Sequence, residues 1–279
     1  MLEHPATCFQ IVMFSLPLTF RRVVALLALS ALGMGIVLAW QTASGEWNRP
    51  RRIGTFQIRS EIPLGERHGQ QLLREIAKLR TEIESTLDLH GPGRPIQVNL
   101  FQSRETYAAF LQTRIPAAEN RSALFVSSPD GGQIYVCYHP DFEQDVRHES
   151  THAVLHESLP RIPLWLDEGL AEYFELPTSQ RRDANPYLIE LREQIELEWA
   201  PDLEHLEQLQ TVDQVRAQDY RECWAWAHFL LHGPEIVRQE LQSYLKILNS
   251  GEPAGKMSDR LRVCLPDMEV QLIHHLRNW

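Results

Sequence analysis

The sequence predicts an α+β fold in which a mixed region of strands and helices precedes a helical C-terminal half. Short apolar runs typical of strands lie before residue 140, interspersed with helical segments. From Asp141 onward the apolar residues recur at helical spacing, with breaks at proline-rich and glycine-rich positions. Segregation of strands and helices in this order favours an α+β architecture over a doubly wound one.

Each element of the mixed region is predicted by its own local signal. Asn48–Arg52 contains Pro50 and is expected to be a linker, and Ser103 is expected to cap a helix. The turn Pro129-Asp130-Gly131-Gly132 predicts a hairpin. Strands are expected at Thr55–Ile62, Pro95–Phe101, Ala123–Ser127 and Gln133–Tyr138, and a helix at Glu66–Leu89.

The first 48 residues differ in composition from the rest of the chain. Val23–Trp40 is an uncharged apolar run of eighteen residues that follows Arg21 and Arg22. As a helix it would span about 27 Å, close to the hydrocarbon thickness of a bilayer. The run predicts either a cleaved signal peptide or a retained transmembrane anchor, and the sequence leaves both open.

This segment suggests a two-part organisation. Residues 1–48 form a leader with its apolar part at 23–40, and residues 49–279 form the functional body, mixed α/β over 55–157 and helical over 158–279. The body is expected to be exported, either anchored in the membrane through an uncleaved leader or periplasmic or otherwise extracytoplasmic. The oligomeric state stays open.

Charge and cysteine content narrow the function classes. The leader's charged residues sum to zero, so the body carries the whole net charge of −10, which excludes a general nucleic-acid-binding protein. Cys137, Cys223 and Cys264 follow the apolar run, and they allow either one disulfide or buried free thiols.

The main chemical signal is the pentapeptide HESTH at 148–152. On a helix, His148 and His152 lie on one face, so both imidazoles can bind one ion. A catalytic zinc accepts histidine nitrogen and keeps one position open for water. Glu149 directly follows the first histidine and can act as the general base. The alternative is a solvated helix face that carries two histidines by chance.

A second predicted helix supplies acidic residues close by in sequence. It lies within PLWLDEGLAEYFE at 163–175 and carries Glu168 and Glu172 one turn apart. Leu166, Leu170 and Tyr173 give this helix an apolar face, so the carboxylates are expected at the edge of a buried seam. Carboxylates there need partners, and a zinc ion with two histidines is a suitable one.

HESTH followed by PLWLDEGLAEYFE resembles the gluzincin metallopeptidases, particularly the small peptidase-MA-like group. The resemblance is most specific over Phe142–Leu176 and extends from Thr55 to about Leu231. It implies a zincin-like domain, with a small mixed sheet packed on the active-site helix, and one zinc ion per chain. It also implies Glu168 as the third zinc ligand, with Glu172 as acceptor for His148 and Asp167 as acceptor for His152.

The chain departs from the large aminopeptidases of this clan in two respects. Fifteen residues separate His152 from Glu168, so the connection between the two helices must be tight. The exopeptidase motif Gly-x-Met-Glu-Asn is missing upstream. Aminopeptidase activity therefore does not follow from the resemblance.

Related enzymes take a Tyr or His from a later helix to stabilise the oxyanion. Tyr220 is the first candidate and His228 the second, and a purely structural role for Tyr220 stays open. The resemblance also implies that Gln133–Tyr138 is an edge strand that binds an extended substrate by strand addition.

The remaining histidines are expected to be structural. His156 lies about 12 Å along the helix from His148, too far to share its ion, and is interpreted as a surface or seam histidine. His228 and His232 repeat the spacing without an intervening glutamate or a nearby acidic helix, which favours packing. Trp224 and Trp226 are expected in the core.

The leading hypothesis is a zinc-dependent hydrolase of peptide or protein substrates. A metal-binding domain without activity, serving envelope assembly or adhesion, is the first alternative, although a structural zinc site has no use for Glu149. The second is a metal-dependent hydrolase of a non-peptide substrate, because fold and site do not specify the substrate.

Overall fold

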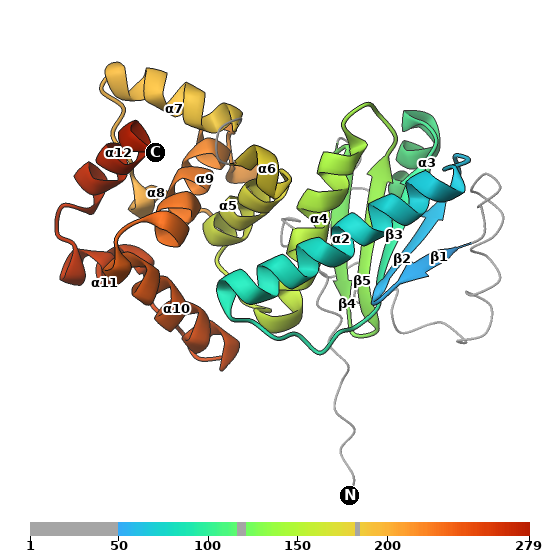
Figure 1. Ribbon diagram of the computed structural model, residues 1–279, viewed down its shortest axis with the longest axis horizontal. Coiled ribbons are helices and arrows are strands. Elements are labelled where there is room, and N and C mark those ends of the chain that lie inside the picture. Colours follow the sequence, from blue (N-terminus) through green and yellow to red (C-terminus); the bar gives the residue numbers. More distant parts are fainter. Residues whose placement is uncertain (1–49, 116–120, 182–184) are drawn as a thin grey trace, which may run out of the picture. The chain divides into compact units, whose positions relative to one another are not determined.

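The computed structural model describes residues 50–115, 121–181 and 185–279, and it confirms the mixed α+β character (Figure 1). The apolar run 23–40 lies outside these residues. Within the described ranges, no helix combines the length and the apolar character that crossing a membrane would require. The described residues divide into two compact units, one at 50–74 and 93–142 and one at 75–92 and 143–279.

The first unit contains a five-stranded mixed sheet with strand order β1-β2-β3-β5-β4. The β2–β3 and β3–β5 pairs are parallel, whereas β1–β2 and β4–β5 are antiparallel. The strands are β1 Arg51–Ile53, β2 Phe56–Ser60, β3 Ile96–Phe101, β4 Ala123–Ser128 and β5 Gly131–Cys137.

Two expectations for this region are wrong. The segment expected as a linker at Asn48–Arg52 contributes to β1, which pairs with β2 in a short antiparallel ribbon. The segment Gln133–Tyr138 forms most of β5, which lies between β3 and β4 and is therefore not an edge strand. The outer strand on that side is β4, because the Pro129-Asp130 turn folds it back along β5.

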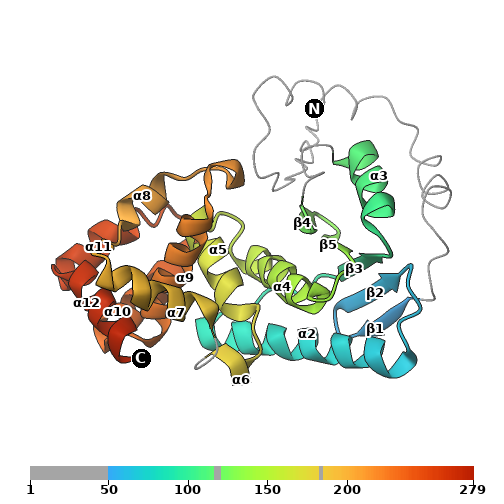
Figure 2. The same cartoon turned by 90° about the horizontal axis from the view of Figure 1, so that it is seen from above.

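Helix α3 (Arg104–Arg114) packs on the sheet of the first unit (Figure 2). Ser103 caps it as expected, since its side chain accepts a hydrogen bond from the Thr106 amide. Its buried face carries Tyr107 and Leu111, which join a cluster with the sheet residues Phe101, Leu124, Tyr135 and Cys137.

The second unit is helical. Its central element is α5, Leu164–Phe174, in which all eleven residues are buried. The other helices with residues in this unit are α2 Glu66–Leu87, α4 Phe142–Ser158, α6 Thr178–Arg181, α7 Pro186–Glu196, α8 Leu203–Gln208, the 3₁₀ turn η3 Val212–Gln214, α9 Ala217–His232, α10 Glu235–Asn249, α11 Met257–Cys264 and α12 Met268–Asn278.

Helices α5 and α9 lie side by side, and Gly169 sets how close they come. A Cβ atom at Gly169 would lie 2.3 Å from the carbonyl oxygen of Cys223, well inside contact distance. Trp224 and Trp226 of α9 are buried in the core, as expected. The close backbone approach therefore fixes the position of α5, on which the acidic residues of the motif lie.

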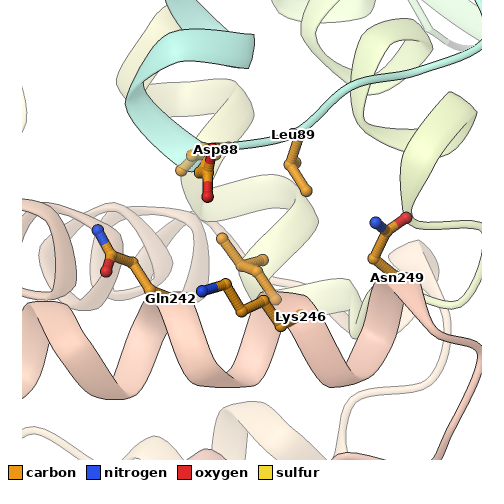
Figure 3. Close-up of a pocket in the computed structure, with 7 residues that line it drawn as sticks. Asp88, Leu89, Gln242, Lys246 and Asn249 are labelled. Carbon is orange, nitrogen blue, oxygen red and sulfur yellow. The ribbon is translucent and has the colours of Figure 1, made fainter.

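The interior of the second unit leaves little space at the end of α2. A cavity of about 20 Å³ is lined by Leu87, Asp88 and Leu89 at the end of α2 and by residues of α10, among them Leu245 and Lys246 (Figure 3). A space of that size has room for about one water molecule. It is too small for a substrate or cofactor.

A histidine cluster fills the seam between α5, α9 and α12. His228 Nδ1 lies 2.9 Å from His275 Nε2, and the hydroxyl of Tyr173 lies 2.7 Å from His232 Nε2. The indole of Trp279 packs against all three imidazoles. Structural packing of His228 and His232 agrees with the expectation from the sequence.

Burial makes these histidines hard to protonate. It lowers the pKa of His228 to about 2, with His232 and His275 adding to the effect. Burial also lowers the pKa of His232 and of His275 to about 4 each, where neighbouring cations and imidazoles contribute.

Free thiols are found at Cys137, Cys223 and Cys264, so the described part of the chain contains no disulfide among them.

Replacing Gly169 with alanine should destabilise the second unit, because the new methyl group would collide with the Cys223 carbonyl. Overpacking of this kind costs about 1–3 kcal/mol or more. Urea unfolding of Gly169→Ala against wild type measures the loss. Gly65→Ala is the matched control, since a Cβ atom there meets open space, and an equal effect of both changes would contradict this account.

The histidine cluster predicts acid lability. Between pH 6.5 and pH 4 the unfolded chain protonates His275 whereas the folded chain keeps it neutral, so the free energy of unfolding falls as the pH falls. His275 alone should contribute less than ~1.4 kcal/mol per pH unit to this slope, because solvent partly screens the ring, and His228 and His232 add contributions of the same sign. His275→Gln should flatten this slope, and His90→Gln at an exposed position should not.

Candidate metal centre

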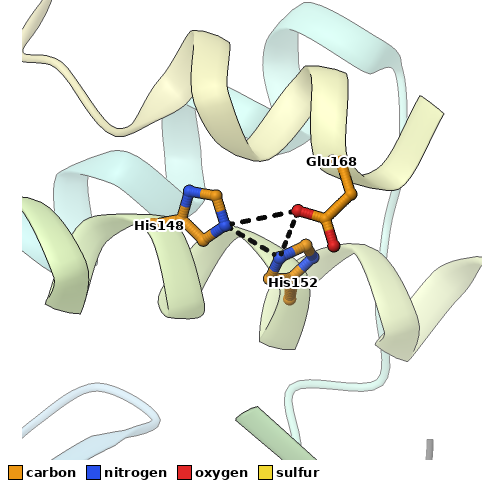
Figure 4. A group of neighbouring side chains, drawn as sticks. All are labelled: His148, His152 and Glu168. Atoms are coloured by element: carbon orange, nitrogen blue, oxygen red, sulfur yellow. Dashed lines mark hydrogen bonds and ion pairs between the residues drawn. The ribbon is translucent and has the colours of Figure 1, made fainter. Parts of the chain in front are cut away.

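The two histidines of the HESTH sequence and the first glutamate of α5 meet in the second unit. His148 and His152 lie one turn apart on α4, and Glu168 faces them from α5 (Figure 4). Both helices form for ordinary local reasons: Glu143 and Asp145 favour the start of α4, and Pro163 precedes the first turn of α5. The short connection brings α5 back along α4, as the fifteen-residue spacing requires.

The three ligand atoms lie within about 0.2 Å of the spacing that a tetrahedral ion would need. The Nε2 atoms of His148 and His152 are 3.1 Å apart, and Glu168 Oε2 lies 3.6 Å from the first and 3.7 Å from the second. An ion with bonds of about 2.0–2.2 Å holds tetrahedral ligands roughly 3.3–3.6 Å apart. The carboxylate is too far away for a hydrogen bond to either nitrogen, yet well placed to share an ion with both.

The group is shielded from solvent. The side chains of His152 and Glu168 are each 4% exposed, and that of His148 is 18% exposed. Two nitrogen ligands and one carboxylate oxygen, buried together, could hold a metal ion. Such a set leaves a fourth tetrahedral position for a further ligand.

Asp167 orients His152, in the position expected for its acceptor. Its Oδ1 atom lies 2.9 Å from His152 Nδ1, and its side chain is 1% exposed. This contact directs the Nε2 atom of His152 toward Glu168. Burial raises the pKa of Asp167, but His152 and His156 outweigh it and hold the pKa well below its ordinary value.

The structure gives His148 a different acceptor from the one implied by the family resemblance. Its Nδ1 atom lies 3.1 Å from Glu175 Oε2, whereas Glu172 was expected in that role. Glu175 is held in turn by Gln144, whose amide donates to Oε1 at 2.6 Å, and Arg147 donates to the carbonyls at the end of α5. Glu175 lies one turn beyond Glu172 on the same face, so helical spacing alone allows either residue.

Glu172 remains close to the centre through another contact. Its buried carboxylate forms a group with His148 and Glu175 and lies near Tyr187 of α7, close enough for the two groups to shift each other's pKa. Burial, together with Glu175 and Glu168, raises the pKa of Glu172 to about 7. Tyr187 was not expected here, because its local sequence, Asn185-Pro186-Tyr187, signals only the start of a helix.

The other expected residues take ordinary positions on their helices. Glu149 is 9% exposed and lies close enough to His148 to raise the pKa of that imidazole. Tyr220 is half-buried and lies in the first turn of α9, one turn before Cys223. The backbone of Cys223 in turn packs against Gly169, the neighbour of Glu168 in the sequence. His156 does not lie on the surface, because its side chain is only 6% exposed.

Two flanking groups also contain three possible ligands each, namely His148, Glu172 and Glu175, and His152, His156 and Asp167. Their closest nitrogen–oxygen distances are 2.8–3.1 Å, which are hydrogen-bond lengths. Both groups use an Nδ1 atom of a histidine whose Nε2 atom belongs to the central group. When the central group holds an ion, a second ion at a flanking group would require an imidazolate ring, so the flanking carboxylates then serve as acceptors for the Nδ1 side of each ring.

The electrostatics of the site favour positive charge. Burial lowers the pKa of His148 and His152, but nearby carboxylates more than compensate. Glu168 and Glu175 hold the pKa of His148 well above its ordinary value, and Asp167 raises the pKa of His152 to about 9. Without a metal, the carboxylates therefore favour a proton between the two facing Nε2 atoms, where an ion would bind.

Comparison of the chain with models of protein families gives no match, and comparison with curated proteins gives none either. The interpretation of the site therefore rests on its geometry and on the sequence pattern.

Metal binding at this centre should release protons. Nearby carboxylates raise the pKa of His148 and of His152, so zinc binding near pH 7 should displace at least one proton from the facing Nε2 atoms. Apparent affinity should rise with pH up to about 9, where His152 deprotonates without help. Calorimetric titration with zinc in buffers of different ionisation enthalpy measures the release, and a binding enthalpy independent of the buffer would contradict the prediction.

Proposed function

We propose that the protein is a zinc-dependent peptidase of the gluzincin type, with one zinc ion per chain bound by His148, His152 and Glu168. The observation that carries this proposal is the spacing of the three ligand atoms, 3.1, 3.6 and 3.7 Å, in a buried group with Glu149 beside it. A zincin-like fold is part of the proposal. It is supported by a mixed sheet in the first unit and by two adjacent helices that carry the ligands.

The chain's residues take distinct roles in this proposal. A bound zinc would supply Lewis-acid activation of a water molecule and of the substrate carbonyl. Glu149 receives the proton of the attacking water and passes it to the leaving amine. Asp167 and Glu175 lie 2.9 and 3.1 Å from the Nδ1 atoms of His152 and His148, and their charges favour a proton on that side of each ring, which keeps both Nε2 atoms available for binding.

Two tyrosines are candidates for stabilising the oxyanion. Tyr220 is the candidate from the sequence and lies on α9, which packs against α5. Tyr187 is the candidate from the structure, because it lies near Glu172 in the immediate surroundings of His148. A neutral donor is needed for this role, and burial raises the pKa of Tyr187 well above its ordinary value.

The substrates proposed are peptides or proteins outside the cytoplasm. Export is supported by the apolar run Val23–Trp40 behind Arg21 and Arg22, which would also tether the enzyme to a membrane where it is retained. The acidic composition of the body supports no role with nucleic acid.

Three substitutions separate metal binding from catalysis. His152→Ala and Glu168→Ala should lose the zinc, because each removes one of three protein ligands. Glu149→Gln should keep about one zinc per chain and lose about 10²–10⁴-fold in kcat/KM on a peptide that the wild type cleaves. Zinc content by elemental analysis and cleavage of a peptide library measure the two properties.

Glu143→Gln, at an exposed position on the same helix, is the matched control and should keep both metal and activity. Full peptidase activity in Glu149→Gln would disprove the assigned base. Zinc binding without cleavage of any peptide by the wild type would favour the non-cleaving domain or a hydrolase of another substrate class.

A further inference from the structure

His156 is linked to the metal centre through a single buried carboxylate. Asp167 lies between two imidazoles of α4: its Oδ1 atom is 2.9 Å from His152 Nδ1, and its Oδ2 atom is 2.8 Å from His156 Nε2. The side chains of Asp167, His152 and His156 are 1%, 4% and 6% exposed. Solvent therefore has little access to these contacts.

The direction of the hydrogen bond between His156 and Asp167 follows from the chemistry of the two groups. An ionised carboxylate only accepts, so His156 must carry a proton on Nε2 and donate it to Asp167. With one oxygen occupied by each ring, the carboxylate of Asp167 cannot rotate without breaking one contact. The orientation of Asp167, and through it that of His152, thus depends on His156.

We propose that His156 is a positioning residue of the metal centre, acting on His152 through Asp167 and slowing loss of the metal. The inference rests on the proposed metal centre at His148, His152 and Glu168, and it adds a residue that contributes no ligand atom. It gives a role to His156, the third histidine on one face of α4 after His148 and His152, which the sequence suggested was a surface or seam residue. A role as ligand is excluded by its place on the helix, two turns and about 12 Å from His148.

A matched pair of substitutions tests whether the Nε2 donor is what matters. A glutamine amide reaches about as far as the Nε2 atom of histidine, whereas an asparagine amide is one methylene shorter and cannot reach Asp167. His156→Asn should weaken zinc binding about tenfold, the lower end of the range for outer-shell partners. His156→Gln should stay within about threefold of wild type, and competition with a chelator measures both affinities.

Two further measurements separate positioning from general stability. The visible absorption of the cobalt-substituted protein should change in His156→Asn and return toward wild type in His156→Gln, because it reports ligand orientation. In the Asp167→Asn background, His156→Asn should produce no additional loss of zinc affinity, since the path through Asp167 is already broken. His156→Phe repeats the test with an apolar ring in case the asparagine variant fails to fold.

Unchanged zinc affinity and cobalt spectrum in His156→Asn or His156→Phe, with equal loss of stability in metal-free and loaded protein, would overturn the positioning role. Equal weakening by glutamine and asparagine would also overturn it, because the donor would then be irrelevant. A wild-type chain that takes up no divalent ion would instead overturn the metal centre itself, and the role of His156 with it.

Discussion

Burial of three carboxylates on one short helix is the constraint on which the rest of the second unit depends. Asp167, Glu168 and Glu172 lie on α5, a helix with no exposed residue, and an unpaired buried carboxylate is costly. Each lies near groups that offset its charge: two imidazoles at Asp167, the facing Nε2 atoms at Glu168, and the nearby His148 and Tyr187 at Glu172. The histidines of α4 thus help to stabilise the buried carboxylates of α5, just as these carboxylates help to form the site.

This arrangement requires the helices to be held at fixed separations. Gly169 allows α9 to approach α5 at backbone contact, and Arg147 donates to the carbonyls of Phe174 and Glu175, where α5 ends. Arg147 directly precedes His148, so one turn of α4 both anchors the end of α5 and presents a ligand. Sites built on packed helices in this way hold their geometry better than sites on loops.

The central part of the site was predictable because its spacing is local. His148 and His152 share a helix face by helical periodicity alone, and the resemblance of the following helix to gluzincins implied the places of Glu168 and Asp167. Contacts that depend on rotamers or on distant segments could not be predicted in this way. Helical spacing allows either Glu172 or Glu175 to contact His148, and the sequence around Tyr187 gives no signal that it lies near Glu172. The sheet shows the same limit, since local signals located the β4–β5 hairpin but not which strand lies at the edge. Pairing partners, not local pattern, decide that position.

The second unit contains histidines at i, i+4 spacing both on α4 and on α9, and their surroundings give the two sets different charge states. His148 and His152 face carboxylates, which raise their pKa values and create a position for a cation. His228 and His232 face other imidazoles and the guanidinium groups of Arg181 and Arg238, and their pKa values fall to about 2 and about 4. Spacing alone therefore does not make a metal centre. An adjacent acidic helix decides which pair of imidazoles attracts an ion and which pair stays neutral in the core, and that is why the sequence following HESTH carries as much information as HESTH itself.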